Sequence, residues 1–475
     1  MKTNPLLASL ALAALMSAGP LHALELSTNG LGQVLIYPYY TVNSGHDTWF
    51  TVSNPHRTGA IVRVRFLEGY RGRPVANVNV FLAPHDTWTA GISRTSSGQG
   101  ALLLTSDHTC TRPAIPASGL AFSSAGYDGT GSLPADDGPV GEARTREGWI
   151  EAIAGAQVRP GTATDLAMRP SGGSPPDCGA IPVAPTDDLV RPASGQINGS
   201  VSIIDVTEGT VFGYTPDAIS HFTETVLYRD EGNLLEPSLA QANSSDSAAG
   251  GAVAYVVADE SDGTPINGPA KYDFAEPIDA VTALFMVDAI YNEYLISPSI
   301  AASTDWVVTF PTRRFYTDPV YGFMDPGGSR PGYSLLFGNY FPRVVDREGT
   351  VVDLVEHRFA NNLNVVAFRA DSQGAPSEVF DSNLAVDLSP PASEGTARLR
   401  FTRDSIDSTS TLTDESLHTL MGQPVTGFAA WRITNSHAQP GLLANYGNVV
   451  HHRTSACATD VWINHMVCLV EPLDN

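Results

Sequence analysis

The sequence predicts a mainly β protein made of antiparallel, immunoglobulin-like β-sandwich units with long loops and one or two helices. Apolar residues alternate with polar ones through residues 32–92, turn residues separate these runs about every 8 to 12 residues, and a similar pattern resumes after Ile300. Hydrophobic residues make up 42% of the 475-residue chain and charged residues only 16%, a composition typical of a globular protein.

The alternation in residues 32–92 assigns one set of apolar side chains to a common face of four strands. The set is Phe50, Val52, Val62, Val64, Phe66, Val78, Val80, Leu82, Trp88, Ala90 and Ile92. Because side chains of a strand alternate between its two faces, these residues need a second layer to bury them. The preceding stretch 31–42 is almost continuously apolar, which predicts a strand covered on both faces. Within it, Pro38 indicates a sheet edge or a bulge.

The rest of the chain predicts further strands and two helices. The expected strands cover residues 148–158, a hairpin over 199–214, and then 252–258, 306–310, 363–369, 397–401, 425–434, 442–451 and 461–469. Pro277, followed by apolar residues near helical spacing, predicts a helix over residues 277–294. A shorter helix is expected over 414–421, capped by Thr413 and ended by Gly422.

The N-terminus predicts export. Lys2 precedes an apolar run that ends in small residues, and Ala23 marks the expected cleavage point of a signal peptide over residues 1–23. The run is shorter than the about 20 residues a membrane-spanning helix needs, so no transmembrane segment is expected in the mature chain. We expect the protein in the periplasm, on the cell surface or outside the cell. The predicted regions are an N-terminal sandwich with long loop excursions over 24–195, a β and helical middle over 196–300, and a sandwich-like C-terminal region over 301–475.

The charge balance excludes some partners. With 27 basic and 50 acidic residues the formal net charge is −23, and the only lysines are Lys2 and Lys271. Such a field repels phosphate groups, so neither nucleic acid nor an anionic membrane surface is an expected partner.

Four cysteines suggest two disulfides in an exported chain. They are Cys110, Cys178, Cys457 and Cys468, which allow three pairings. We favour the pairing of neighbours, Cys110 with Cys178 and Cys457 with Cys468, because each bond then closes a loop inside one region.

No catalytic or cofactor-binding residue is predicted. The chain contains no G-x-S-x-G and no HExxH, and Gly327-Gly328-Ser329-Arg330-Pro331 is the nearest approach to a nucleophile elbow. Whether a metal is bound is left open. A transition metal could use His451, His452, Cys457, His465 and Cys468, although a disulfide is favoured there. Calcium could be held by the acidic loops 128–137 and 259–263, although solvated turns are favoured.

The tryptophans bear on carbohydrate binding. Trp49, Trp88, Trp149, Trp306, Trp431 and Trp462 could stack on sugars, but most fall in strand patterns, so core packing is expected for each. The tetrapeptide His-Asp-Thr-Trp occurs at His46 and again at His85. In both copies we expect Asp-Thr to open a strand and Trp to fill the core.

Several longer stretches carry a resemblance. LSTNGLGQVLIYPYYTVN from Leu26, VRFLEG from Val64, STDWVVTFPTRRFY from Ser303 and LLANYGNVV from Leu442 resemble a group of uncharacterised predicted secreted or surface proteins of Gram-negative bacteria. The resemblance implies export and a β-rich structure, and it brings no activity, cofactor or catalytic residue.

Two hypotheses about function follow. In the first, the protein is a non-enzymatic surface or extracellular-matrix structural protein that contacts other surface proteins or copies of itself, including assembly into a filament or layer. Residues 24–42 could then add as a strand to a neighbour's sheet edge. In the alternative, the protein is secreted and binds or cleaves carbohydrate through aromatic side chains in the long loops, with an unnamed carboxylate pair for cleavage.

Overall fold

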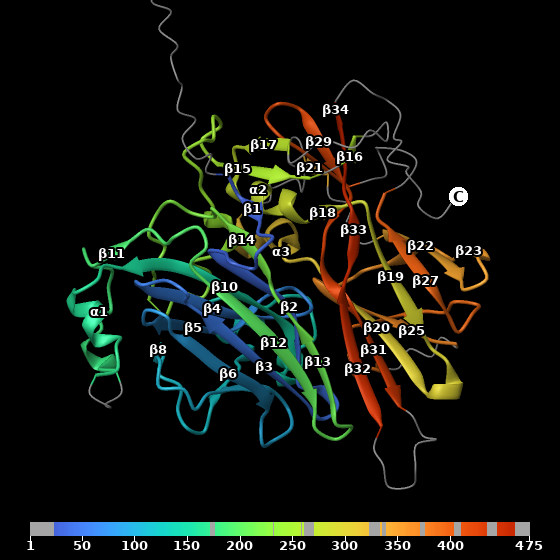
Figure 1. Ribbon diagram of the computed structural model, residues 1–475, viewed down its shortest axis with the longest axis horizontal. Helices are drawn as coiled ribbons and strands as arrows, with labels where there is room; N and C mark the ends of the chain where they lie inside the picture. Colours follow the sequence, from blue (N-terminus) through green and yellow to red (C-terminus); the bar gives the residue numbers. More distant parts are fainter. Residues whose placement is uncertain are drawn as a thin grey trace, which may run out of the picture.

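The computed structural model describes residues 23–171, 176–230, 232–257, 259–260, 270–322, 333–334, 339–370, 376–402, 410–434 and 444–460. It confirms the mainly β class: most sheets are antiparallel, and the described residues form three α-helices, α1 (Ala163–Ala167), α2 (Pro277–Phe285) and α3 (Arg313–Thr317) (Figure 1). The immunoglobulin-like sandwich detail stays a prediction.

Two sheets make up the N-terminal part. The outer sheet has the order β13 (Thr210–Tyr214), β12 (Asn198–Asp205), β3 (His46–Ser53), β6 (Thr87–Arg94), β7 (Ala101–Leu104) and β9 (Leu120–Ala121). The central sheet has the order β1 (Glu25–Leu26), β14 (Asp217–Ser220), β2 (Val34–Thr41), β10 (Glu147–Val158), β4 (Gly59–Glu68), β5 (Pro74–Leu82) and β8 (Cys110–Arg112), with β11 (Leu189–Val190) beside β10. Strands β12 and β14 pair with β3 and β2, so residues 198–220 complete these two sheets.

The apolar set predicted from the alternation lies between the two sheets. All eleven predicted side chains are buried in one core cluster. The rings of Phe50 on β3 and Phe66 on β4 have centroids 5.7 Å apart, and Tyr37 on β2 lies 6.0 Å from Phe50. The period of two therefore identifies the buried faces of both sheets correctly.

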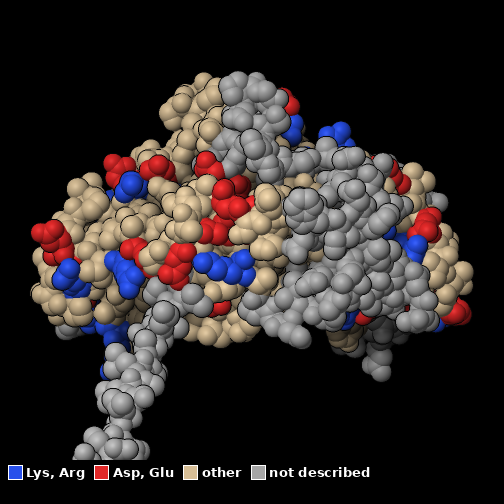
Figure 2. Space-filling view, turned by 90° about the horizontal axis from the view of Figure 1, so that it is seen from above, with Lys and Arg blue, Asp and Glu red and all other residues tan. Residues whose placement is uncertain are grey.

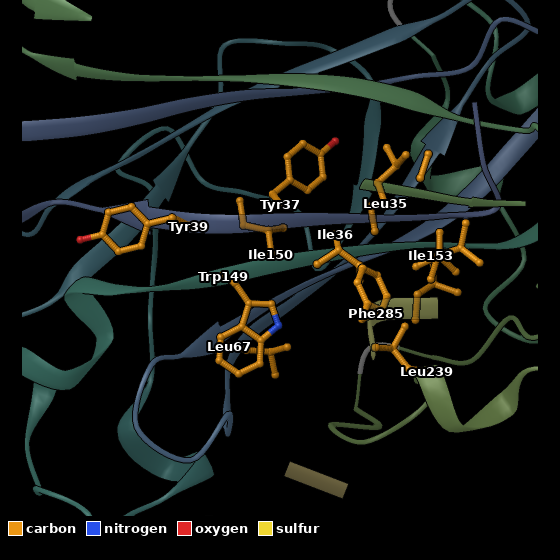
Figure 3. Close-up of a cluster of buried hydrophobic side chains, with 14 of the residues drawn as sticks. Leu35, Ile36, Tyr37, Tyr39, Leu67, Trp149, Ile150, Ile153, Leu239 and Phe285 are labelled. Atoms are coloured by element: carbon orange, nitrogen blue, oxygen red, sulfur yellow. The ribbon is translucent and has the colours of Figure 1, made fainter. Parts of the chain in front are cut away.

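Strand β2 is buried on both faces, as its continuous apolar run predicts. Figure 3 shows Tyr37 on one side of the strand and Ile36 on the other, with Trp149 and Phe285 on the side of Ile36. Pro38 marks a bulge, because Tyr37 pairs with Ile150 but Tyr40 pairs with Gly148. On the other side of β2, pairing with β14 ends at Ile36, so Pro38 lies just beyond the paired part of that side.

Two further sheets form the C-terminal part on the right of Figure 1. The joining sheet has the order β26 (Ala385–Leu388), β25 (Leu363–Phe368), β20 (Ala302–Thr309), β31 (Thr426–Thr434) and β32 (Asn445–His451). The C-terminal sheet has the order β23 (Val351–Asp353), β22 (Asn339–Asp346), β27 (Glu394–Arg400), β19 (Ala289–Leu295) and β33 (Arg453–Ser455), with β24 (His357–Arg358) beside β22. Their facing side chains share a second core cluster, in which the rings of Tyr294 and Phe368 stack with centroids 5.2 Å apart.

The N-terminal and C-terminal parts share a continuous core. Strand β20 is buried on both faces, and Thr309 at its end donates a hydrogen bond to the Pro38 carbonyl at 2.7 Å. Tyr39 packs against Phe380, with ring centroids 5.1 Å apart. The joining sheet therefore connects the two parts rigidly instead of leaving a polar interface between them.

Small sheets lie at the top of Figure 1. They pair β15 (Ala252–Val256) with β17 (Ala270–Phe274), pair β18 (Met286–Val287) with β30 (Gln423–Pro424), and combine β16 (Asp259–Glu260), β34 (Cys457–Asp460), β29 (His418–Met421), β28 (Thr411–Thr413) and β21 (Tyr333–Ser334). The predicted strands up to residue 451 all overlap observed strands, and the strand predicted over 461–469 lies outside the described residues.

Both predicted helices need correction. The first ends at Phe285, and residues 289–295 form β19, where Ile290, Asn292 and Tyr294 are buried with a period of two. The second is wrong. Asp414 accepts hydrogen bonds from the backbone N–H groups of Ser416 and His418, and this side-chain turn connects β28 to β29 in a hairpin.

The disulfide between Cys110 and Cys178 confirms the first predicted pair. It ties β8 to the chain segment that follows α1, with a sequence separation of 68 residues. Cys468 lies outside the described residues, so the second pair stays a prediction.

On the face shown in Figure 2, acidic and basic side chains are interspersed among broad uncharged areas. The helices found in the described ranges are too short or too polar to cross a membrane.

Candidate functional site

The outer sheet has one face in the core and one open to solvent. Burial along β3 and β13 alternates strictly, with Phe50, Val52 and Phe212 in the core and the residues between them partly or fully exposed. We call the outward side the open face. Its residues are Asp47, Trp49, Thr51 and Ser53 on β3, Thr87, Thr89, Gly91 and Ser93 on β6, Ser200, Ser202 and Ile204 on β12, Val211 and Gly213 on β13, and Leu102 and Leu104 on β7.

Trp49 is the large aromatic side chain of the open face. It is 48% exposed, and its cross-strand neighbours are Gly91 and Ser202. A Cβ built on Gly91 would lie 3.5 to 3.8 Å from three atoms of the indole, so the ring lies over Gly91 with room for a methyl group between them. The indole is thus packed over this part of the sheet on one side, while about half of it stays open to solvent.

Pairs of hydroxyl groups lie beside Trp49 along the strands. The hydroxyls of Thr51 and Ser200 are 3.1 Å apart, and Thr87 donates to the Ser53 hydroxyl at 2.9 Å. A hydroxyl group offers one donor and two acceptor positions, so each pair keeps hydrogen-bonding capacity for a third group. These contacts also hold the side chains in fixed orientations before any ligand arrives.

The open face is almost free of charge. Asp47 is the one ionisable side chain among the outward positions of β3, β6, β7, β12 and β13. In a chain with a formal net charge of −23, such a stretch of neutral hydroxyl, glycine and apolar residues is distinctive. The surface can stack on a planar or C–H-rich face and donate or accept several hydrogen bonds, but it offers no counter-charge to an ion.

The two His-Asp-Thr-Trp copies differ in which way the tryptophan points. Trp88 is fully buried, as predicted, but the prediction of core packing is wrong for Trp49. On β3 the even-numbered residues Phe50 and Val52 face the core, so Trp49, at an odd-numbered position, faces outward. On β6 the even-numbered residues also face the core, and Trp88 is one of them. The alternation of β3 therefore already contained the signal for an outward Trp49, and the repeated tetrapeptide obscured it.

The other described tryptophans are buried or partly buried. Trp149 and Trp306 are fully buried, and Trp431 is partly buried against the second core cluster. Trp462 lies outside the described residues.

The predicted metal candidates are not brought together where the structure describes them. His452 uses both ring nitrogens: Nδ1 accepts from the Asn292 amide at 2.7 Å and Nε2 donates to the Val307 carbonyl at 2.8 Å. Burial lowers the pKa of His452 to about 3, which keeps the ring neutral. His451 lines a cavity, and His465 and Cys468 are outside the described residues.

The carboxylates of the acidic loop 128–137 are occupied by other partners. Asp136 pairs with Arg144, and Asp137 pairs with Arg71 at 2.7 Å. Asp128 accepts from the backbone of Thr130 at 2.8 Å. Asp259 and Glu260 of the other acidic loop lie in β16, while Ser261 to Gly263 lie outside the described residues, as does the Gly327 to Pro331 stretch. In the described ranges no three His, Cys, Asp or Glu side chains form a metal-sized group.

Two buried carboxylates at the junction of the two parts are bonded within the core. Glu147 accepts from the Ser382 hydroxyl at 2.6 Å and from the Asn383 N–H at 2.9 Å, and Asp305 accepts from the N–H groups of Val379 and Phe380. Burial raises the pKa of Glu147, and it raises the pKa of Asp305 to about 6. Both groups anchor the segment 377–384 against the sheets.

Comparison with known proteins finds no matching family model, no matching curated protein and no matching solved structure.

Proposed function

We propose that this protein is exported, has no catalytic activity of its own, and binds neutral carbohydrate on the open face of its outer sheet. The observation that carries the proposal is Trp49, a half-exposed indole beside Gly91 with pairs of serine and threonine hydroxyls next to it toward the end of β3.

The chemistry of a pyranose ring fits this surface. One face of many sugars presents C–H groups, which pack on the electron-rich face of an indole, while the hydroxyls at the ring edge need hydrogen-bond partners. Thr51, Ser200, Ser53 and Thr87 supply such partners on one side of Trp49, toward the end of β3. A neutral sugar also avoids the repulsion that the acidic chain would exert on an anionic one.

Binding is favoured over cleavage by the carboxylate content of the face. A glycosidase of the usual kind needs two carboxyl groups about 5 to 9.5 Å apart, one on each side of the scissile bond. Asp47 is the single carboxylate among the outward residues of the five strands that form the open face. The Cys110–Cys178 disulfide supports export, because such bonds persist in oxidising compartments.

A structural role by strand donation has less support. The Leu24 backbone is hydrogen-bonded to Val253 and Tyr255, β1 pairs with β14, and β2 lies inside the central sheet. Residues 24–42 are thus paired within their own subunit, and we do not propose that they add as a strand to a neighbouring subunit.

The test is a binding screen with purified protein against immobilised neutral oligosaccharides, such as cello-, chito-, laminari- and manno-hexaoses, and against acidic polygalacturonate. We expect binding to at least one neutral series and none to the acidic polymer. Trp49→Ala should weaken it at least about fivefold, while Leu166→Ala, which truncates a 64% exposed side chain on α1, should not. Equal binding by wild type and Trp49→Ala, or binding to the acidic polymer alone, would overturn the proposal.

A further inference from the structure

A cavity of about 380 Å³ opens where the N-terminal and C-terminal parts meet. Its wall is formed by the turn after β1, the start of β14, the end of α2 and the strands β31 to β33, which gather near the centre of the molecule (Figure 1). The volume is in the range of small-molecule sites, about 300 to 1,000 Å³.

Asp217 is the acidic group of this cavity. It begins β14 and accepts a hydrogen bond from the hydroxyl of Thr426, which begins β31, 209 residues further along the chain. An ionised carboxylate can accept about four hydrogen bonds, so a single hydroxyl leaves most of its capacity unused. Burial raises the pKa of Asp217, whereas the nearby His451 lowers it.

The rest of the lining adds apolar surface and little positive charge. Leu284 and Phe285 at the end of α2, together with Val287, Ile290 and Val425, form the apolar part of the wall. The end of a helix carries a partial negative charge, which favours a cation there. The titratable side chains of the lining are Asp217, His451 and His452, and the hydrogen bonds of His452 to Asn292 and Val307 keep its ring neutral.

We propose that this cavity binds a small organic cation, a primary ammonium group on a short aliphatic chain. The ammonium donates hydrogen bonds to Asp217, and the aliphatic chain lies against Leu284, Phe285 and Val425. The net charge of −23 attracts such cations to the protein, and the apolar wall selects those with a hydrocarbon part over inorganic ions. This inference is independent of carbohydrate binding on the open face.

The experiment compares n-hexylamine with 1-hexanol and hexanoate by isothermal titration calorimetry at pH 7.5. These probes share a chain length and differ in the charge of the head group. We expect hexylammonium to bind at least about tenfold more tightly than hexanol, and hexanoate not to bind. Equal affinity for hexylammonium and hexanol would overturn the proposal in the wild-type protein itself.

Two variants test whether the ammonium group contacts Asp217. Asp217→Asn keeps an acceptor for the Thr426 hydroxyl but removes the charge, so hexylammonium should lose about tenfold in affinity while hexanol is unchanged. His451→Gln should bind hexylammonium at least as tightly as wild type. An unchanged preference in Asp217→Asn, or a tenfold loss in His451→Gln, would contradict the assignment of the ammonium to Asp217.

Discussion

The two N-terminal sheets share one core but differ in what lies on their other faces. The far face of the central sheet is buried and carries ionic groups, among them Glu151, which pairs with Arg314 of α3 at 2.7 Å with both side chains fully buried. The far face of the outer sheet is open, nearly uncharged and carries Trp49. The same alternating pattern thus gives a structural layer in one sheet and a candidate binding surface in the other.

The difference teaches where to look for function in this chain. Charged residues of the central sheet, such as Arg65 and Glu151, are used to hold other parts of the chain in place, through the Pro237 carbonyl and Arg314 respectively. Buried ionisable groups in such a layer serve packing, and they are a poor guide to catalysis. Neutral residues left exposed on a rigid sheet are the better candidates for ligand contact.

The largest effect should come from comparing the two tryptophans of the repeated tetrapeptide. Trp88→Ala leaves a cavity between the sheets and should lower the free energy of unfolding by about 4 kcal/mol. Trp49→Ala removes an exposed ring and should change it by less than about 0.5 kcal/mol. Urea unfolding of both variants checks this. Similar losses in the two variants would mean that Trp49 supports the fold and would contradict the comparison.

The buried ion pair of the central sheet should be nearly as sensitive. Arg314→Met leaves the Glu151 carboxylate buried without its cation, and we expect a loss of about 3 kcal/mol in urea unfolding. The double variant Arg314→Met/Glu151→Leu should recover only part of this loss, because it removes the buried carboxylate but leaves the neighbouring buried Arg65 without it. An exposed pair such as Arg347 and Glu348 is the matched control, and Arg347→Met should cost less than about 1 kcal/mol. Equal losses for the two pairs would refute the distinction.

A smaller effect should appear in the pH dependence of stability. The pKa of Asp305 is raised to about 6 in the folded protein, above its unfolded value of about 3.9. Between these values the folded state holds a proton that the unfolded state lacks. The contribution of Asp305 to stability is therefore fully present below about pH 4 and lost as pH rises through 6, with a size on the order of 3 kcal/mol.

Asp305→Asn isolates this contribution. The Asn oxygen can still accept from Val379 and Phe380, so the variant should gain on wild type as pH rises from 5 to 8. His452, whose pKa is lowered, acts with the opposite sign, but it is present in both proteins and cancels in the difference. A difference between variant and wild type that stays constant with pH would show that Asp305 does not titrate in this range.

Much of the fold was predictable, and the reason is local. The inward sets on β3, β4, β5 and β6 follow from a period of two, and the double burial of β2 follows from its continuous apolar run. The helix over 277–294 was overextended because Ile290 and Tyr291 continue the helical spacing, whereas in β19 the buried residues Ile290, Asn292 and Tyr294 follow a period of two. The partner strand β27, about 100 residues away, decides between them.

The candidate sites were harder to predict because they depend on contacts between strands that are far apart in the sequence. The outward direction of Trp49 could be predicted from the alternation in β3. Its position beside Gly91 and Ser202 depends on the pairing of strands β3, β6 and β12. The contact between Asp217 and Thr426 joins two strands 209 residues apart, and neither neighbourhood in the sequence signals it.

The central claim is that Trp49 on the open face contacts carbohydrate, and its most direct measurement is calorimetric titration of the best neutral oligosaccharide into wild type, Trp49→Phe, Trp49→Ala and Leu166→Ala. Stacking on an aromatic ring contributes about 1 to 3 kcal/mol in comparable flat-ring contacts, which is about 5- to 150-fold in affinity. We expect Leu166→Ala to match wild type, Trp49→Phe to bind more weakly, and Trp49→Ala to bind more weakly still by this margin. Affinities that are the same in all four proteins would contradict the account.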